Sequence, residues 1–274
     1  MKQLKIITVP LIASVLLISG CSDNTQSANS LGGETNNGGS LGDSQPTGKI
    51  NAAGFYVLYD PAVPQVFDSE LAYQQQQVTV TVYAEDINDL VEVNGQTVNF
   101  RTEWGAWLNE RDSCVLSNGQ CSVTWRSGAP DTAPQDCRVA ITAWTVGEES
   151  FFDENDNNLF DSSETLYDME EPFLDINSNG NFDGALSTFE GVGELIDIKD
   201  FDGRSGKDTV HDVADGKYTG TLCASGNTSC SGRTSMIIHY RSELLIQSPF
   251  TDSNDLDGDG DTSEKINLCN FSSY

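Results

Sequence analysis

Hydrophobic and polar residues alternate along much of the chain between residues 51 and 150. The clearest run is 78–84, where Val or Ala at every second position is separated by Thr79, Thr81 and Tyr83. A period of two indicates a β-strand with one buried face. The same period recurs in three later groups, which are Val98 and Phe100, then Cys121, Val123 and Trp125, and then Val139, Ile141 and Ala143.

Short turn signals separate these predicted strands. Asn94-Gly95 precedes the second strand and Asn118-Gly119 precedes the third, and such dipeptides favour tight hairpin turns. Several short strands joined in this way predict a mainly β fold, with an immunoglobulin-like β-sandwich over residues 51–150. A small β-barrel is the alternative.

The strand sequences also resemble a known family. The relevant segments are Val78 to Asp86, Gly95 to Gly105, Asn118 to Trp125 and Val139 to Thr145, followed by Thr234 to Ser248, where Met236, Ile238 and Tyr240 suit a closing strand. In their order and turns they resemble the bacterial Ig-like domains of the invasin and intimin type. The resemblance implies closing strands within residues 216–250 and a role as a spacer or adhesive module of the bacterial surface. Residues 151–215 would then be an insertion before the last strand.

The predicted insertion is strongly acidic, and its acids are regularly spaced. Residues 148–215 contain 20 acidic residues against three basic ones. Asp153, Asn155, Asn157, Leu159, Asp161 and Glu164 occupy positions 1, 3, 5, 7, 9 and 12 of a twelve-residue loop. This is the ligand order of an EF-hand calcium loop, in which position 7 contributes its backbone carbonyl. Asn158 replaces the usual turn glycine, and Asn tolerates left-handed backbone better than most residues.

A second loop of the same kind follows 22 residues later. Its candidate ligands are Asp175, Asn177, Asn179, Asn181 and Asp183, with Gly180 at position 6, and the same shift maps Glu149 onto Glu171 and Phe160 onto Phe182. Leu186 stands where a bidentate Glu is usual, so this loop must bind calcium more weakly or borrow another carboxylate. Because the flanking residues are not strongly helical, we expect loops that resemble those of dockerin or of thrombospondin type 3 repeats. A solvated acidic loop without metal is the alternative.

A third acidic run lies near the C-terminus, within residues 251–274. Asp255, Asp257, Asp259 and Asp261 alternate around two glycines, and Glu264 follows them. This alternation of oxygen ligands suits a further calcium site. A charged tail is the alternative.

The charge of the chain limits its partners. The formal net charge is −28, and without Lys2 and Lys5 of the N-terminal segment the 14 basic residues become 12 and the net charge becomes −30. Nucleic acid and anionic lipid are therefore poor partners. Self-repulsion of this size destabilises a compact state unless cations neutralise it. We therefore expect Ca²⁺ as the cofactor.

The cysteines are expected to form disulfides. Apart from Cys21 there are six, and an even number in an exported protein favours disulfides over free thiols. Cys114 with Cys121 and Cys223 with Cys230 each flank a short turn sequence, which predicts two local disulfides and leaves Cys137 to pair with Cys269. Zinc is the competing interpretation, but the chain has no CxxC spacing and only two histidines.

The first 20 residues have the features of a signal peptide. Lys2 and Lys5 precede an apolar run over 6–18, which is too short for a permanent membrane-spanning helix. Ile18-Ser19-Gly20-Cys21 resembles the lipobox of bacterial lipoproteins. The resemblance implies cleavage before Cys21 and acylation of its thiol, which would anchor the protein to a membrane. An ordinary signal peptide is the alternative.

The residues after Cys21 predict a flexible tether and a location. Residues 21–50 are mostly Ser, Asn, Gly, Thr and Gln, with too few apolar residues to form a core. Ser22 stands where Asp marks inner-membrane retention in many lipoproteins, and this favours the outer membrane. We expect a lipid-anchored protein of the cell envelope.

Two classes of function remain. The first is a non-enzymatic, calcium-rigidified module that binds a protein or a glycan, or acts as a spacer. The second is an exported hydrolase, such as a glycosidase that uses paired carboxylates. The sequence contains no GxSxG, no HExxH and no Cys–His dyad. His211 beside Asp212 is expected to be a surface pair, and we predict no catalytic residue.

Overall fold

A computed structural model describes residues 47–66, 73–87, 93–134, 136–184, 196 and 211–246. Cys21, Leu186 and the C-terminal candidates Asp255, Asp257, Asp259, Asp261 and Glu264 lie outside the described residues. Within the described ranges, no helix has both the length and the apolar composition needed to cross a membrane.

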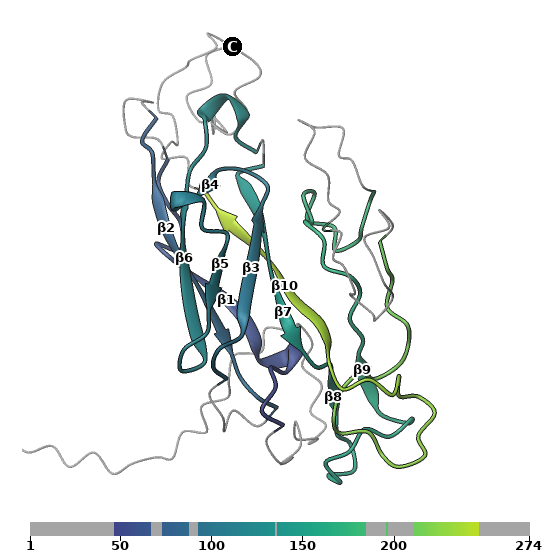
Figure 1. Cartoon of the computed structure of the whole chain (residues 1–274). Helices are drawn as coiled ribbons and strands as arrows, with labels where there is room; N and C mark the ends of the chain where they lie inside the picture. Colours follow the sequence, from purple (N-terminus) through teal and green to yellow (C-terminus); the bar gives the residue numbers. More distant parts are fainter. Residues whose placement is uncertain are drawn as a thin grey trace, which may run out of the picture. The chain divides into compact units, whose positions relative to one another are not determined.

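Two four-stranded antiparallel sheets form the centre of the molecule (Figure 1). The first sheet has the order β1 (Phe55–Asp60), β2 (Gln77–Ala84), β6 (Gln120–Arg126) and β4 (Ala106–Trp107). The second has the order β10 (Met236–Leu245), β7 (Arg138–Gly147), β3 (Thr97–Thr102) and β5 (Ser113–Val115). The orders β1-β2-β6-β4 and β10-β7-β3 correspond to the ABED and GFC sheets of an immunoglobulin constant-type domain. The predicted β-sandwich is therefore confirmed.

The core lies between the inner faces of the two sheets. In β2, Val78, Val80 and Val82 are fully buried, while Thr79 and Gln77 on the opposite face are exposed. Trp125 of β6 is also fully buried, and its indole nitrogen donates to the carbonyl of Trp104 at 2.9 Å. The alternation in the sequence thus corresponds to the two faces of a strand.

Shorter elements complete the described structure. Three 3-10 helices, η1 (Ala52–Gly54), η2 (Leu108–Glu110) and η3 (Pro130–Thr132), connect strands of the sandwich, and the hairpin β8 (Ser150–Phe152) and β9 (Thr165–Tyr167) lies in the insertion. The described residues contain no α-helix. Residues 216–235 form turns and isolated bridges, so β10 alone closes the sandwich where closing strands had been predicted.

The predicted tether ends earlier than expected. Ile50 is fully buried in the core, and Thr47 donates from its backbone nitrogen and its hydroxyl to the buried carboxylate of Asp86. The Thr47 hydroxyl also donates to Glu148, whose other oxygen accepts from the nitrogen and hydroxyl of Thr221 at 2.9 Å. Residues 47–50 are therefore part of the folded unit.

Both predicted local disulfides are present. Cys114–Cys121 joins β5 of the second sheet to β6 of the first, and Cys223–Cys230 closes a short loop in the insertion. Because these four thiols are paired, they hold no zinc. Cys137 is also disulfide-bonded, with a partner beyond the described residues, so the pairing of Cys137 with Cys269 stays a prediction.

Candidate metal site in a repeated loop

The first loop, residues 153–164, brings three of its candidate ligands to one point. Oδ2 of Asp161 accepts from the side-chain nitrogen of Asn155 at 2.9 Å and from that of Asn157 at 2.6 Å. These residues hold positions 3, 5 and 9 of the predicted loop. A half-turn of each amide would place its oxygen at the same point, and the two amide orientations differ only in the hydrogen bonds that they satisfy.

The two ends of this loop are held by carboxylates. Asp153 is fully buried, and its two oxygens accept from the backbone nitrogens of Asn157 at 3.2 Å and Asn158 at 2.7 Å. Glu164, at position 12, accepts from the backbone nitrogens of Glu154 at 3.1 Å and Asp161 at 2.9 Å. The carboxylates therefore fold the chain back on itself through a tight turn.

The second loop, counted from residue 175, repeats these contacts. Oδ2 of Asp183 accepts from the side-chain nitrogens of Asn177 and Asn179, both at 2.6 Å. The two oxygens of Asp175 accept from the backbone nitrogens of Asn179 at 3.1 Å and Gly180 at 2.8 Å. Each bond has its counterpart 22 residues earlier, so the sequence repeat is also a repeat of structure.

The backbone turns in the same places in both loops. Asp156 and Ser178, at position 4, have φ of 57° and 58°, and Asn158 and Gly180, at position 6, have φ of 64° and 78°. This left-handed conformation favours Gly, and Asn adopts it more readily than most residues. Asn158 thus takes the conformation of the turn glycine that it replaces.

A repeated carboxylate clamp fixes both units to the return segment, defined as residues 211–219. The nitrogen of Glu149 donates to the carbonyl of Thr219 at 3.0 Å, and the nitrogen of Thr219 donates to the Glu149 carboxylate at 2.7 Å. Glu171 makes the same pair of bonds with Asp212, at 2.8 and 3.1 Å. Glu149 and Glu171 are both almost completely buried, and they are 22 residues apart.

Aromatic residues at corresponding positions pack beneath each loop. Phe151 and Phe160 have ring centroids 5.5 Å apart, and their counterparts Phe173 and Phe182 are 5.9 Å apart. Tyr218 of the return segment packs against both Phe151 and Phe160, at 5.3 and 5.1 Å. The loops are therefore supported by a small apolar cluster of their own.

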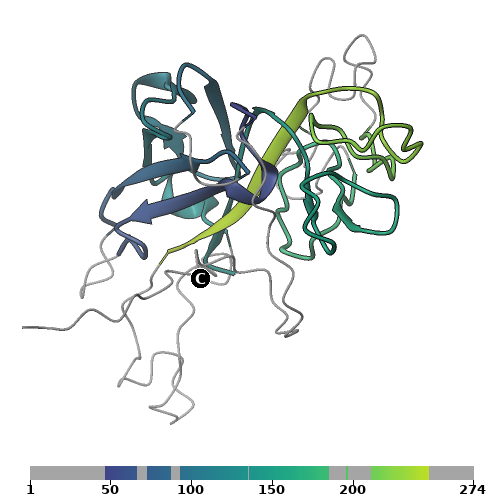
Figure 2. The same ribbon diagram turned by 90° about the horizontal axis from the view of Figure 1, so that it is seen from below.

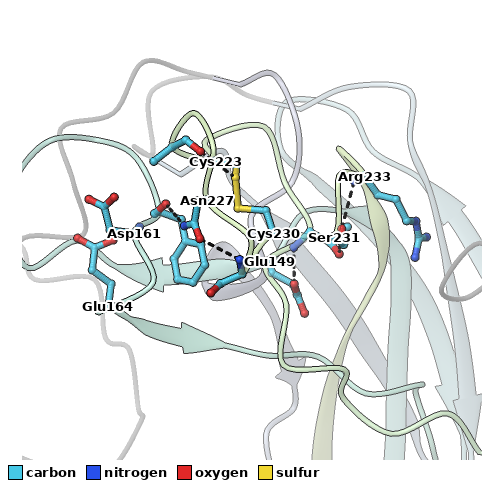
Figure 3. Close-up of a disulfide and its surroundings, with 12 residues drawn as sticks. Glu149, Asp161, Glu164, Cys223, Asn227, Cys230, Ser231 and Arg233 are labelled. Carbon is cyan, nitrogen blue, oxygen red and sulfur yellow. Dashed lines mark hydrogen bonds between the residues drawn. A yellow bond between two sulfur atoms is a disulfide. The ribbon is translucent and has the colours of Figure 1, made fainter.

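The Cys223–Cys230 loop holds the first loop at position 8. The nitrogen of Phe160 donates to the carbonyl of Leu222 at 2.6 Å, and the Phe160 carbonyl accepts from Ala224 at 3.2 Å and from the Asn227 side chain at 2.8 Å. Figure 3 shows Asn227 beside the disulfide, with Asp161 and Glu164 near one another on one side. The disulfide thus stabilises the segment that positions the candidate ligands.

His211 links the second unit to the sandwich, and the prediction of a surface pair with Asp212 is wrong. Its side chain is only 5% exposed, it stacks on Phe182 at 4.3 Å, and Nε2 lies 3.2 Å from the Glu170 carboxylate. Burial on its own raises the pKa of Glu170, but the contacts with His211 and Arg241 hold the pKa below its ordinary value. The sequence neighbour of a histidine was a poor guide because its partners come from residues far along the chain.

The insertion contacts the outer face of the second sheet. The Thr142 hydroxyl of β7 donates to the carbonyl of Phe173 at 2.7 Å, and the Arg241 guanidinium of β10 lies 4.1 Å above the Phe173 ring. Arg241 also bonds to Glu170 at 3.0 Å. In Figure 2 the insertion lies beside β10. These contacts orient the second loop against the sandwich.

Several carboxylates of the insertion are buried without a neighbouring cation. Burial raises the pKa of Glu149 to about 8, against hydrogen bonds from Met169 and Thr219, and the nearby charge of Asp168 adds to the rise. Burial also raises the pKa of Asp168, and it raises that of Glu164, where the charges of Asp153 and Asp161 act in the same direction. Negative charge in the insertion is therefore costly as it stands.

The oxygen-rich donor set fits calcium better than a transition metal. Calcium is bound by carboxylates, amide oxygens and backbone carbonyls, whereas zinc requires Cys, His or carboxylate clusters. Among the described residues, no group of three or more His, Cys, Asp and Glu is placed to hold a metal ion. A calcium loop instead takes part of its ligands from residues such as Asn155, Asn157 and the carbonyl of Leu159. The structure brings the predicted ligands of each loop together, and Asn181 turns with them by donating to Asn179 at 2.7 Å.

Comparisons with protein-family models, with curated proteins and with solved structures found no match.

Proposed function

We propose that the protein is a lipid-anchored cell-envelope module that is stabilised by calcium and works by binding or spacing, without catalysis. What supports the proposal is the repeated convergence of Asn and Asp side chains, at Asp161 in the first loop and at Asp183 in the second. The bound ion would supply positive charge where these oxygens meet. The immunoglobulin-like sandwich is a fold that serves many unrelated functions, so the partner has to be argued from a site.

Calcium would explain how so acidic an insertion stays folded. The loops bury Asp153, Glu164 and Glu149 while only a small aromatic cluster supports them. The chain's own residues already hold each loop in a closed turn, so binding would require little reordering of the backbone. One site at 100 times its dissociation constant stabilises the folded state by about 2.7 kcal/mol.

The deciding experiment is thermal unfolding of the purified chain in Ca²⁺, in Mg²⁺ and in EGTA. We expect calcium to raise the melting temperature by roughly 5–10 °C, given the usual relation between stability and Tm for a domain of this size. Glu164→Gln should remove most of the calcium-dependent rise, because the neutral amide is a weaker ligand than a carboxylate.

Glu154→Gln is the matched control. Glu154 lies in the same loop at position 2, where its side chain is exposed and outside the ligand set, so its calcium response should equal that of the wild type. A melting temperature that is the same in calcium and in EGTA would refute the calcium part of the proposal.

The membrane anchor is tested separately. Cells given radiolabelled palmitate should incorporate label into the wild-type protein, and Cys21→Ser should abolish the label and release the protein from the membrane fraction. Retention of Cys21→Ser in the membrane fraction without label would contradict anchoring through this thiol. Neither result depends on calcium.

A further inference from the structure

A second concave surface belongs to the sandwich alone. It is an open hollow of about 400 Å³ between β3 of one sheet and β4 of the other. Phe100 and Trp107 line it, with ring centroids 5.4 Å apart and planes at 53°. Small-ligand sites commonly have volumes of about 300–1,000 Å³ and aromatic walls with a few polar groups. The hollow has the size and the apolar surface of such a site.

Polar groups surround these rings. Arg101, Glu110 and Asp112 also line the hollow. Within the part of the chain that the structure describes, no hydrogen bond or ion pair engages the carboxylates of Glu110 and Asp112 or the indole nitrogen of Trp107. One donor and two acceptor groups at this surface are therefore available to a ligand.

The backbone around the hollow is unusual. Asn109 and Glu110 are consecutive non-glycine residues, both with φ of 58°. Such residues cost about 1–3 kcal/mol each, and they concentrate at ligand sites. Gly105 has φ of +83°, and a Cβ there would lie 2.4 Å from the carbonyl oxygen of Arg126. Bare backbone therefore forms one part of the wall.

The chemistry of this surface suits a sugar. The faces of pyranose rings carry C–H groups that pack on aromatic rings, and their neighbouring hydroxyls are neutral groups that donate to carboxylates and accept from N–H groups. Two unpaired carboxylates, in a chain with a net charge of −28, repel anionic polymers. The ligand that fits is a neutral saccharide.

We propose that this hollow binds a neutral saccharide chain, with Trp107 packing against a sugar ring and Glu110 and Asp112 accepting hydrogen bonds from its hydroxyls. The inference rests on the binding role proposed above and specifies its ligand. It does not rest on calcium, because the residues that line the hollow belong to β3, β4 and the segment that follows them.

The test is calorimetric titration of the mature chain in detergent with three neutral probes, cellohexaose, maltohexaose and laminarihexaose. The wild type should bind at least one of them. Trp107→Ala and Glu110→Gln should each weaken binding about tenfold or more, as expected for residues at the centre of a site. Trp107→Phe keeps an aromatic ring in the core and should lose less, which separates binding from folding. Asp60→Asn, an exposed carboxylate on β1, is the control and should bind as the wild type does.

Several outcomes would overturn the site. These are an absence of heat with all three hexasaccharides, equal affinity in every variant, or binding of a lysine-rich peptide in place of a saccharide. Chromatography of the probe after incubation tests catalysis. Shortened products that disappear in Glu110→Gln would support the site and refute the non-enzymatic function.

Titration in calcium and in EGTA separates the two proposals. Saccharide binding that persists while the melting temperature ignores calcium would refute only the calcium module. A calcium-stabilised chain that binds none of the probes would refute only the saccharide site.

Discussion

The pair Glu149 and Asp168 predicts how stability depends on pH. Glu149 has an ordinary pKa of 4.5 and a pKa of about 8 in the folded chain, chiefly because it is buried and in part because Asp168 is close. Between these two values the folded chain keeps a proton that the unfolded chain has lost. The stability that this carboxyl contributes is therefore fully present below pH 4.5 and is lost as the pH rises towards 8.

Asp168→Asn tests this coupling. The Asp168 oxygen that accepts from Gly216 at 2.7 Å can be kept by the amide, while the other oxygen is buried without a hydrogen-bond partner among the described residues. An amide nitrogen at that second position removes a negative charge and offers a donor beside Glu149. We expect the pKa of Glu149 to fall by about one unit, which corresponds to a gain of about 1.4 kcal/mol at pH 8.

The assay is urea unfolding followed by tryptophan fluorescence at pH 5, 6, 7 and 8, with calcium saturating throughout. The wild type should lose up to about 1.4 kcal/mol of unfolding free energy per pH unit from this group, and Asp168→Asn should lose less. Asp60→Asn removes an exposed charge and should leave the slope unchanged. A slope in Asp168→Asn equal to that of the wild type would refute the coupling.

Two further predictions concern positions where the fold leaves little freedom. Gly105→Ala should lower the unfolding free energy by several kcal/mol in urea, because its backbone is left-handed and its Cβ would meet Arg126 and Trp125; a variant as stable as the wild type would contradict this. Replacing Cys223 and Cys230 by Ser should cost about 2–3 kcal/mol and should weaken calcium binding by the first loop more than by the second, which separate loop variants measured by calorimetry would reveal; equal effects on both loops would contradict the support that Phe160 receives.

The strands of the sandwich were predictable because each has one face towards the core. Alternation in residues 78–84 is repeated in the burial of β2, and the other predicted strands follow the same rule. The strands β4 and β5 have two and three residues, which is too short for any period to be recognised. Their positions depend on pairing with β6 and β3, and that information is distributed over distant parts of the chain.

The candidate ligands were predictable for a different reason. Their geometry is local, because oxygen-bearing residues at fixed spacing in a tight turn meet one another with little help from the rest of the fold. The clamps of Glu149 and Glu171 were visible in the sequence only as repeated residues. Their partners, Thr219 and Asp212, contribute backbone groups, and a backbone group leaves no mark on the residue type. The same limit applied to His211.

The insertion leaves and re-enters the sandwich at one place. Gly147, the last residue of β7, is opposite Met236, the first residue of β10, so a tight turn of a few residues would join the two strands equally well. Residues 148–235 are in effect a cassette within a hairpin, and lengthening such an excursion adds little to its closure entropy. Gaining or losing a 22-residue unit would then leave the host strands in register, which makes this hairpin a natural point for grafting foreign loops.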